Sequence, residues 1–241
     1  MAHSRSPHSP TTHCRARLPA LALCVLLAGH GVWRASLETA PVRVRELPDA
    51  PPQSWLALAA LGDPLPLSRI LMLWLQAFDT QAGARLGLRD LDYARVEAWL
   101  RRCLDLAPEA QYPLLAASRF YAEVPDPVRA RSMLDFVSTA FAEDPARRWP
   151  WLAHAVFVAR HRLNDPALAL VHARQLAQDK NPGIPNWARQ MEIFVLEDMG
   201  ETEAAKILLG GLLESGKITD PHEARFLAER LAAMEHSKNA P

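Results

Sequence analysis

The chain has 241 residues, which allows one large or two small domains. Its 27 basic and 27 acidic residues give no net charge and no basic stripe of the kind that binds duplex nucleic acid. Leu and Ala dominate the hydrophobic residues, while Ile and Thr are scarce, so helix formers outnumber strand formers. The composition therefore predicts an all-α fold and no nucleic-acid partner.

The N-terminal segment, residues 1–17, contains three arginines and no acidic residue, and an apolar stretch follows at 18–33 (LPALALCVLLAGHGVW). As a helix this stretch reaches about 24 Å, slightly less than the roughly 30 Å of a bilayer core. A signal peptide and an uncleaved anchor both fit. Because no clear small-x-small cleavage site follows, we favour a transmembrane anchor at residues 18–34. This predicts a single-pass protein of the inner (cytoplasmic) membrane, whose main domain lies on the periplasmic or extracytoplasmic side.

Residues 35–53 contain four prolines, which predicts an extended linker. Residues 54–235 show helical periodicity and form the expected domain, followed by a tail at 236–241. The segment 79–91 contains two glycines and is expected to be a loop, the main irregular candidate for a binding site. Helices are predicted at 54–61, 64–78, 92–106, 111–122, 127–142, 149–162, 166–178, 185–198, 202–215 and 221–235.

An acidic residue recurs along this domain at steps of 29, 34, 39 and 36 residues. Apolar residues occupy the positions four, eight and eleven residues after each acid, as on one face of a helix. A period in this range indicates stacked helical hairpins. Where Pro follows the acid, we expect a helix N-cap rather than a catalytic carboxylate. The recurring acids are Asp63, Asp92, Asp126, Asp165 and Glu201.

The run from Asp92 to Pro108 (DYARVEAWLRRCLDLAP) resembles the second helix of a tetratricopeptide repeat, in which a Gly-Asp-Tyr turn precedes a helix ending Ala-Leu-x-Leu-x-Pro. The segment Met199-Gly200-Glu201-Thr202-Glu203-Ala204-Ala205 is similar to that family in its Gly and its small residues. The resemblance covers roughly residues 54–215. It implies a right-handed solenoid of stacked helical hairpins with a concave groove for a protein or peptide.

In such stacks the first helix of each hairpin lines the groove. Counted from the acids, the inward positions lie 14, 11, 7 and 4 residues earlier; before Asp165 they include Val158. They combine aromatic, Arg and His side chains, which are typical of binding hot spots. We therefore expect a non-catalytic, membrane-tethered scaffold whose partner is an unidentified protein or peptide of the cell envelope. The partner-binding residues expected from this register are Tyr112, Leu115, Arg119, Trp151, His154, His161, Trp187, Gln190 and Glu197.

Two other functions remain open. His154 and His161 lie seven residues apart on one helix face and, with Asp165, could serve an enzyme or a metal site. The tryptophans could instead bind an envelope glycan. The sequence contains no GxSxG, Walker-type loop, GxGxxG, HExxH or CxxC, so it predicts no enzyme, no cofactor and no metal.

Two further features have a structural and a functional interpretation. Cys103 occupies an apolar helix position and is expected to be buried and unpaired. The run Arg147-Arg148-Trp149-Pro150-Trp151 could clamp a phosphate or an aromatic group, or could simply begin a helix.

Overall fold

The computed structural model describes residues 13–36, 46–78 and 90–237, and every regular element within them is a helix. The predicted all-α class is therefore confirmed for this part of the chain. The chain divides into two compact units, Met1–Arg43 and Val44–Pro241, and each is described by itself.

The first unit contains α1 (His13–Ser36), which includes the predicted anchor. Its described side chains, over residues 21–36, are all exposed. Among the described residues, no single helix is long and apolar enough to cross a membrane. The helices Gln53–Ala59 and Pro64–Ala77, bent by 114°, pass this test of length and composition only as a pair. The membrane anchor stays a prediction.

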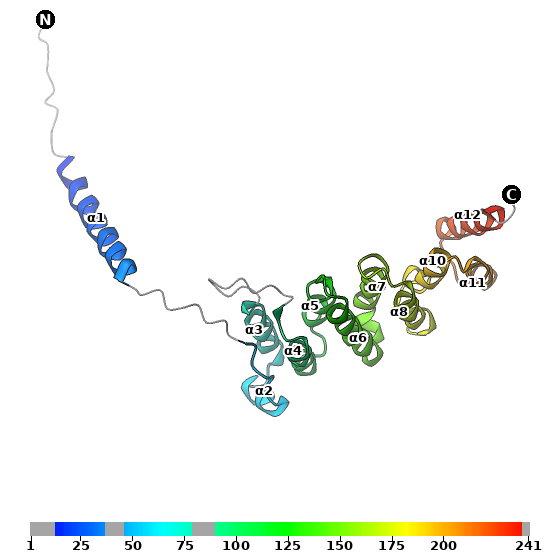
Figure 1. Cartoon of the computed structure of the whole chain (residues 1–241), viewed down its shortest axis with the longest axis horizontal. Coiled ribbons are helices and arrows are strands. Elements are labelled where there is room, and N and C mark those ends of the chain that lie inside the picture. The colour runs from blue at the N-terminus through cyan, green and yellow to red at the C-terminus, as the bar shows by residue number, and fades with distance from the viewer. Residues whose placement is uncertain (1–12, 37–45, 79–89, 238–241) are drawn as a thin grey trace, which may run out of the picture. The chain divides into compact units, whose positions relative to one another are not determined.

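The second unit is a succession of helices close to those predicted (Figure 1). Its elements are α2 (Gln53–Ala59), α3 (Pro64–Ala77), α4 (Tyr93–Leu106), α5 (Tyr112–Arg119), the 3-10 turn η2 (Tyr121–Glu123), α6 (Pro127–Glu143), α7 (Pro145–His161), α8 (Pro166–Gln178), α9 (Asn186–Arg189), α10 (Met191–Asp198), α11 (Thr202–Glu214) and α12 (Pro221–Ser237). Most of the predicted loop at 79–91 lies outside the described residues.

Three helix predictions need correction. The predicted helix 111–122 ends at Arg119, and the 3-10 turn η2 follows at Tyr121–Glu123. Helix α7 begins at Pro145, four residues before the predicted start, because Asp144 caps it by accepting a hydrogen bond from the Arg147 amide. The predicted helix 185–198 is interrupted at Gln190, which separates α9 from α10.

The recurring acids cap helices in most units. Asp92 and Asp126 each accept hydrogen bonds from two backbone amides of the following turn, and Asp165 accepts one from Leu168. The expected cap by Asp63 is wrong, since its side chain accepts no such bond. The reason lies in the sequence, because Pro66 removes the third amide of α3, one of the two donors that an N-cap residue can reach.

Consecutive helices pack against one another in chain order. Helix α7 lies against α5, α6 and α8, and α10 lies against α7, α8 and α11. The predicted apolar register is confirmed after the last three acids, where the positions four and eight residues on are all fully inaccessible to solvent. These are Ala130, Leu134, Ala169, Ala173, Ala205 and Leu209. The arrangement is compatible with a helical repeat fold.

Part of the expected linker belongs to the folded unit. Residues 46–52 lie along α4, where Arg95 Nη1 donates to the Leu47 carbonyl at 2.7 Å and Trp99 Nε1 to the Pro48 carbonyl at 2.8 Å. The Leu47 side chain is buried as well. The Pro51 carbonyl likewise accepts from Arg102 Nε of α4, at 3.1 Å, so side chains of α4 satisfy backbone carbonyls that form no helix or sheet bond.

Cys103 is buried and unpaired, as predicted. Burial raises the pKa of its thiol to about 12, so the reactive thiolate is suppressed. Its backbone carbonyl accepts a hydrogen bond from Ser68 Oγ at 2.9 Å, which connects α4 to α3.

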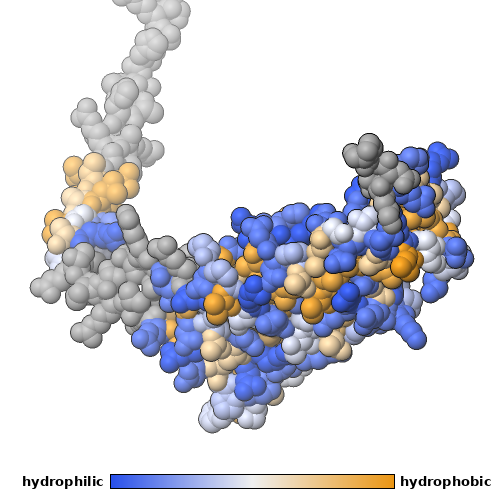
Figure 2. All heavy atoms as spheres, turned by 45° about the vertical axis from the view of Figure 1, so that its right-hand side comes forward, coloured by the Kyte–Doolittle hydropathy of each residue, from blue (hydrophilic) through white to orange (hydrophobic). Residues whose placement is uncertain are grey.

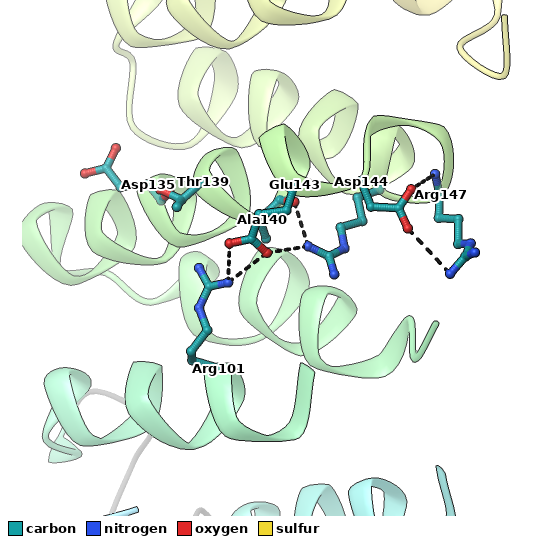
Figure 3. Close-up of polar contacts among 8 residues, drawn as sticks. Arg101, Asp135, Thr139, Ala140, Glu143, Asp144 and Arg147 are labelled. Carbon is teal, nitrogen blue, oxygen red and sulfur yellow. Dashed lines mark hydrogen bonds and ion pairs between the residues drawn. The ribbon is translucent and has the colours of Figure 1, made fainter. Parts of the chain in front are cut away.

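Glu143, at the end of α6, joins three helices (Figure 3). Its carboxylate accepts hydrogen bonds from Arg101 of α4 and from Arg148 of α7, each at 2.8 Å. Burial raises the pKa of Glu143, but the hydrogen bonds and charges of Arg148 and Arg101 outweigh it and hold the pKa below its usual value. Arg148 also donates to the Ala140 carbonyl at 2.8 Å, and its side chain is 5% exposed.

This junction predicts different roles for two adjacent arginines. Arg148→Met should lower the free energy of unfolding by about 1–3 kcal/mol, because it leaves a buried carbonyl without its donor. Arg147→Met is the matched control. That side chain is 57% exposed, and its ion pair should contribute less than about 1 kcal/mol. Urea unfolding followed by circular dichroism measures both, and equal midpoints for the two variants would contradict the assignment.

Candidate functional site

The predicted partner-binding residues lie on α5, on α7, and on α9 and α10 with the break between them. Helix α5 and helix α7 pack against each other, and α7 in turn contacts α10. The residues differ widely in exposure, so each was placed by its contacts.

Two aromatic residues of the predicted set connect neighbouring hairpins. Trp151 of α7 is half-buried, and its Nε1 donates to Gln111 Oε1 at 2.7 Å, just before α5. Tyr112 of α5 is also half-buried and accepts a hydrogen bond from Gln76 of α3. Leu115, on α5, is partly buried. These positions pack between units and offer little free surface.

A polar cluster lies where α5 and α7 end. His154 Nε2 is 3.8 Å from Glu123 Oε1, and Arg162 Nη2 is 3.0 Å from the other oxygen of that carboxylate. Burial lowers the pKa of His154, and the charge of the exposed Arg119 lowers it further, against the opposite effect of Glu123. His154 is therefore mainly neutral at neutral pH.

An exposed aromatic residue, Phe157, continues this cluster along α7. Its ring contacts two imidazoles, that of His154 at a centroid distance of 5.9 Å and that of His161 at 4.7 Å. Phe157 is 50% exposed. It also lines a cavity of about 150 Å³ between α7 and α10, together with His161 and Phe194.

The last three predicted residues, Trp187, Gln190 and Glu197, differ in whether helix α12 covers them. Gln190 is 6% exposed and donates a hydrogen bond to Glu223 of α12. Glu197 accepts two hydrogen bonds from Arg230, also on α12. Helix α12 thus covers positions that were expected to face a partner. Trp187 remains accessible, at 54% exposure. Its ring packs edge to face with that of Trp149, at a centroid distance of 5.3 Å.

Counting from the acids missed two residues of this region. The position seven residues before Asp165 is Val158, which is fully buried, whereas the adjacent Phe157 is exposed. Glu123, next to His154, lies in η2 rather than in a helix of the predicted register. We call the exposed side chains of Arg119, Phe157 and His161 the first-helix surface. It is one part of a mixed exterior, where apolar and hydrophilic residues alternate (Figure 2).

The alternative sites receive little support from the geometry. Within residues 13–36, 46–78 and 90–237, no group of three His, Cys, Asp or Glu side chains is placed to hold a metal ion. In the predicted arginine clamp, Arg148 is buried against Glu143 and Arg147 pairs with Asp144. The two guanidinium groups therefore already have acidic partners.

In comparisons with known proteins, no family model, no curated protein and no solved structure matched the chain. The function must therefore be argued from the residues and their geometry.

One buried histidine lies outside the predicted site. His172 of α8 is 1% exposed, and neither ring nitrogen has a hydrogen-bond partner among the described residues. Burial lowers the pKa of His172, while Asp135 of α6, Gln175 and Asp165 act in the opposite direction. The imidazole is thus held neutral inside the helical stack.

This position predicts acid sensitivity. The folded-state pKa of His172 lies below the unfolded value of about 6.5, so below that pH the unfolded chain binds more protons. The free energy of unfolding should then fall as pH drops from about 7 toward 5, by at most about 1.4 kcal/mol per pH unit. Urea unfolding of the wild type and of His172→Leu across this range measures the difference. Parallel pH profiles for the two proteins would contradict it.

Proposed function

We propose that the chain is a membrane-tethered, non-catalytic scaffold, a tetratricopeptide-like solenoid that binds a protein or peptide of the cell envelope. The binding groove runs along the first helices of the hairpins, with the first-helix surface at its centre. The order of packing supports the solenoid, since each hairpin contacts the one before it and the one after it.

The observation that carries this proposal is the environment of Phe157. A half-exposed aromatic ring lies between two imidazoles, beside a small cavity and close to charged residues. Arg and aromatic side chains dominate the energetics of protein interfaces, particularly next to pockets that can be desolvated. A partner side chain inserted between α7 and α10 would contact Phe157 and Phe194 together.

Most of the predicted residues act indirectly in this scheme. Trp151 connects α7 to Gln111 at the start of α5, and Tyr112 connects α5 to α3. Gln190 and Glu197 hold α12, while Leu115 is partly buried. Direct contact with a partner falls to the exposed Arg119, Phe157 and His161, with Trp187 farther along. A rigid frame reduces the ordering cost of binding, which favours affinity.

The tether rests on α1. Its exposed Leu21, Leu26 and Val32 suit a lipid environment, and the preceding residues carry three arginines without an acid. The excess of positive charge would keep that end in the cytoplasm. The helical unit would then lie on the periplasmic or extracytoplasmic side of the inner membrane.

Reporter fusions test this topology. Alkaline phosphatase joined to residue 241 should be active in a bacterial host, whereas a reporter that works only in the cytoplasm should be silent. Activity of the cytoplasmic reporter alone would refute the proposed orientation. A shortened, soluble product would show that the N-terminal segment is a cleaved signal peptide.

Substitution of the exposed ring tests the partner surface. Phe157→Ala should reduce recovery of a co-purified partner by about tenfold or more, the loss expected of an interface hot spot. Its melting temperature should stay within about two degrees of the wild type, because surface changes rarely exceed about 0.5 kcal/mol. Val171→Ala is the matched control, since Val171 is an apolar residue of α8 with a similar exposure of 53%.

The experiment uses the full chain extracted from membranes, with bound proteins identified by mass spectrometry and glycans assayed in parallel. Arg119→Ala and His161→Ala should weaken the same interaction. If the triple variant of Arg119, Phe157 and His161 retains every partner of the wild type, the proposed surface is wrong. Recovery of glycan alone would favour the glycan-binding alternative.

A further inference from the structure

A second and larger cavity lies on a different part of the helical unit. Its volume is about 460 Å³, and it is bordered by the end of α8, the connection from α8 to α9, and helices α10 and α11. Small-molecule sites usually occupy about 300–1,000 Å³. None of Arg119, Phe157 and His161 lines it, so this cavity is separate from the first-helix surface.

The walls of the cavity are largely apolar. Ile184 and Ile193 are buried and line one part of it, and Leu208 and Leu212 of α11 line another. Leu208 is 40% exposed. An apolar ligand group that covers Leu208 and Leu212 would remove their exposed hydrocarbon surface from water, which is favourable.

The charged residues of the cavity differ in whether another group of the protein already binds them. Glu192 is neutralised by Arg174, at 3.1 Å. The Arg189 guanidinium donates to three backbone carbonyls of the α8–α9 connection, those of Asp179, Asn181 and Ile184. Arg189 is therefore occupied in holding the connection.

Two lysines remain at the cavity. Lys180 and Lys217 both line it and are exposed, and among the described residues neither side chain has an ion pair or a hydrogen bond. Lys180 precedes α9 in the chain, and Lys217 follows α11. The uncompensated charge of the cavity is thus positive: it comes from these two ammonium groups and from the Arg189 guanidinium, whose partners are neutral carbonyls.

The connection that carries Lys180 is internally braced. Asp179 Oδ1 accepts from the Asn181 amide at 2.8 Å, and Asn181 Oδ1 accepts from the Gly183 amide at 2.9 Å. Together with Arg189, these bonds fix the backbone on which one wall of the cavity is built. A preformed wall lowers the conformational cost of binding a ligand.

We propose that this cavity binds a small amphipathic anion, whose apolar chain or ring packs against Ile184, Ile193, Leu208 and Leu212. Its single anionic group, a carboxylate or a phosphate, lies between the ammonium groups of Lys180 and Lys217. The combination of an apolar wall with two unpaired cations on its rim selects a ligand that has both an apolar part and an anionic group. The site is independent of the proposed partner groove.

Calorimetric titration of the full chain, in a non-ionic detergent held at constant concentration, tests the proposal. The probes are octanoate and octyl phosphate, with octanol as the apolar part alone and acetate as the anionic part alone. At least one charged amphiphile should bind saturably at one site per chain, and more tightly than octanol or acetate. The relative affinities of octanoate and octyl phosphate identify the preferred anionic group.

Substitutions separate the two parts of the site. Lys180→Met combined with Lys217→Met should weaken binding of the charged amphiphile by about tenfold or more, because charge-assisted contacts are the stronger class of hydrogen bond. Lys206→Met is the control, since Lys206 lies on α11 and is paired with Glu203 at 3.4 Å. That variant should bind as the wild type does. Leu208→Gln should weaken octanoate while leaving the melting temperature nearly unchanged.

A diazirine-bearing octanoate locates the bound probe. Light-induced labelling followed by peptide mapping should mark residues within 177–217, and unlabelled octanoate should compete. The proposal is overturned if no saturable binding occurs, if the double lysine variant binds as the wild type, or if the label falls only on other segments such as α1. Loss of the co-purified partner in the Phe157→Ala variant is a separate readout, so failure of one proposal is distinguishable from failure of the other.

Discussion

The close approach of successive helices at buried alanines is the constraint on which the rest of this structure depends. Ala130, Ala169 and Ala205 occupy the same position in three units, and each is inaccessible to solvent. A larger side chain at such a position would push adjacent helices apart, since protein interiors are packed as densely as organic crystals. The spacing set there decides which of the longer side chains can reach the next unit.

Those longer side chains join the units through specific polar contacts. Trp151 donates a hydrogen bond to Gln111, and Gln76 donates one to Tyr112. Glu143 accepts hydrogen bonds from both Arg101 and Arg148. Each contact connects an element of one unit with an element of another, so rotation of a single helix would break several of them. Phe157 is half-exposed while its neighbours Val156 and Val158 are buried, because successive residues of a helix point about 100° apart.

Local sequence signals predicted much of the fold. Apolar spacing located the helices, and the recurring acids located the starts of α3, α4, α6, α8 and α11, because capping involves only a few adjacent residues. The predicted start of helix α7 at Trp149 is wrong, because Asp144-Pro145 provides the N-cap and α7 begins at Pro145. Pro150 lies inside the helix and leaves the Ala146 carbonyl without its usual amide donor.

The candidate site was less predictable because it depends on tertiary contacts. Counting from the acids placed Gln190 and Glu197 at the groove, but α12 returns along α10 and takes both side chains. No local pattern indicates which helix will cover another. The same counting selected the buried Val158 instead of Phe157, since an error of one residue rotates a helix position by about 100°.

The interruption at Gln190 connects the two ends of the last hairpin. On one side of the break, Arg189 holds the α8–α9 connection, which forms a wall of the larger cavity. At the break itself, Gln190 lines that cavity and also bonds Glu223 of α12. A continuous helix would turn each residue by about 100° from the one before it, so consecutive side chains point in fixed, different directions. The two adjacent residues at the end of α9 also have different partners: Arg189 holds the α8–α9 connection, and Gln190 bonds Glu223 of α12. Gln190 therefore belongs both to the lining of the cavity and to the contact with α12, so the proposed ligand site and the terminal helix share a residue.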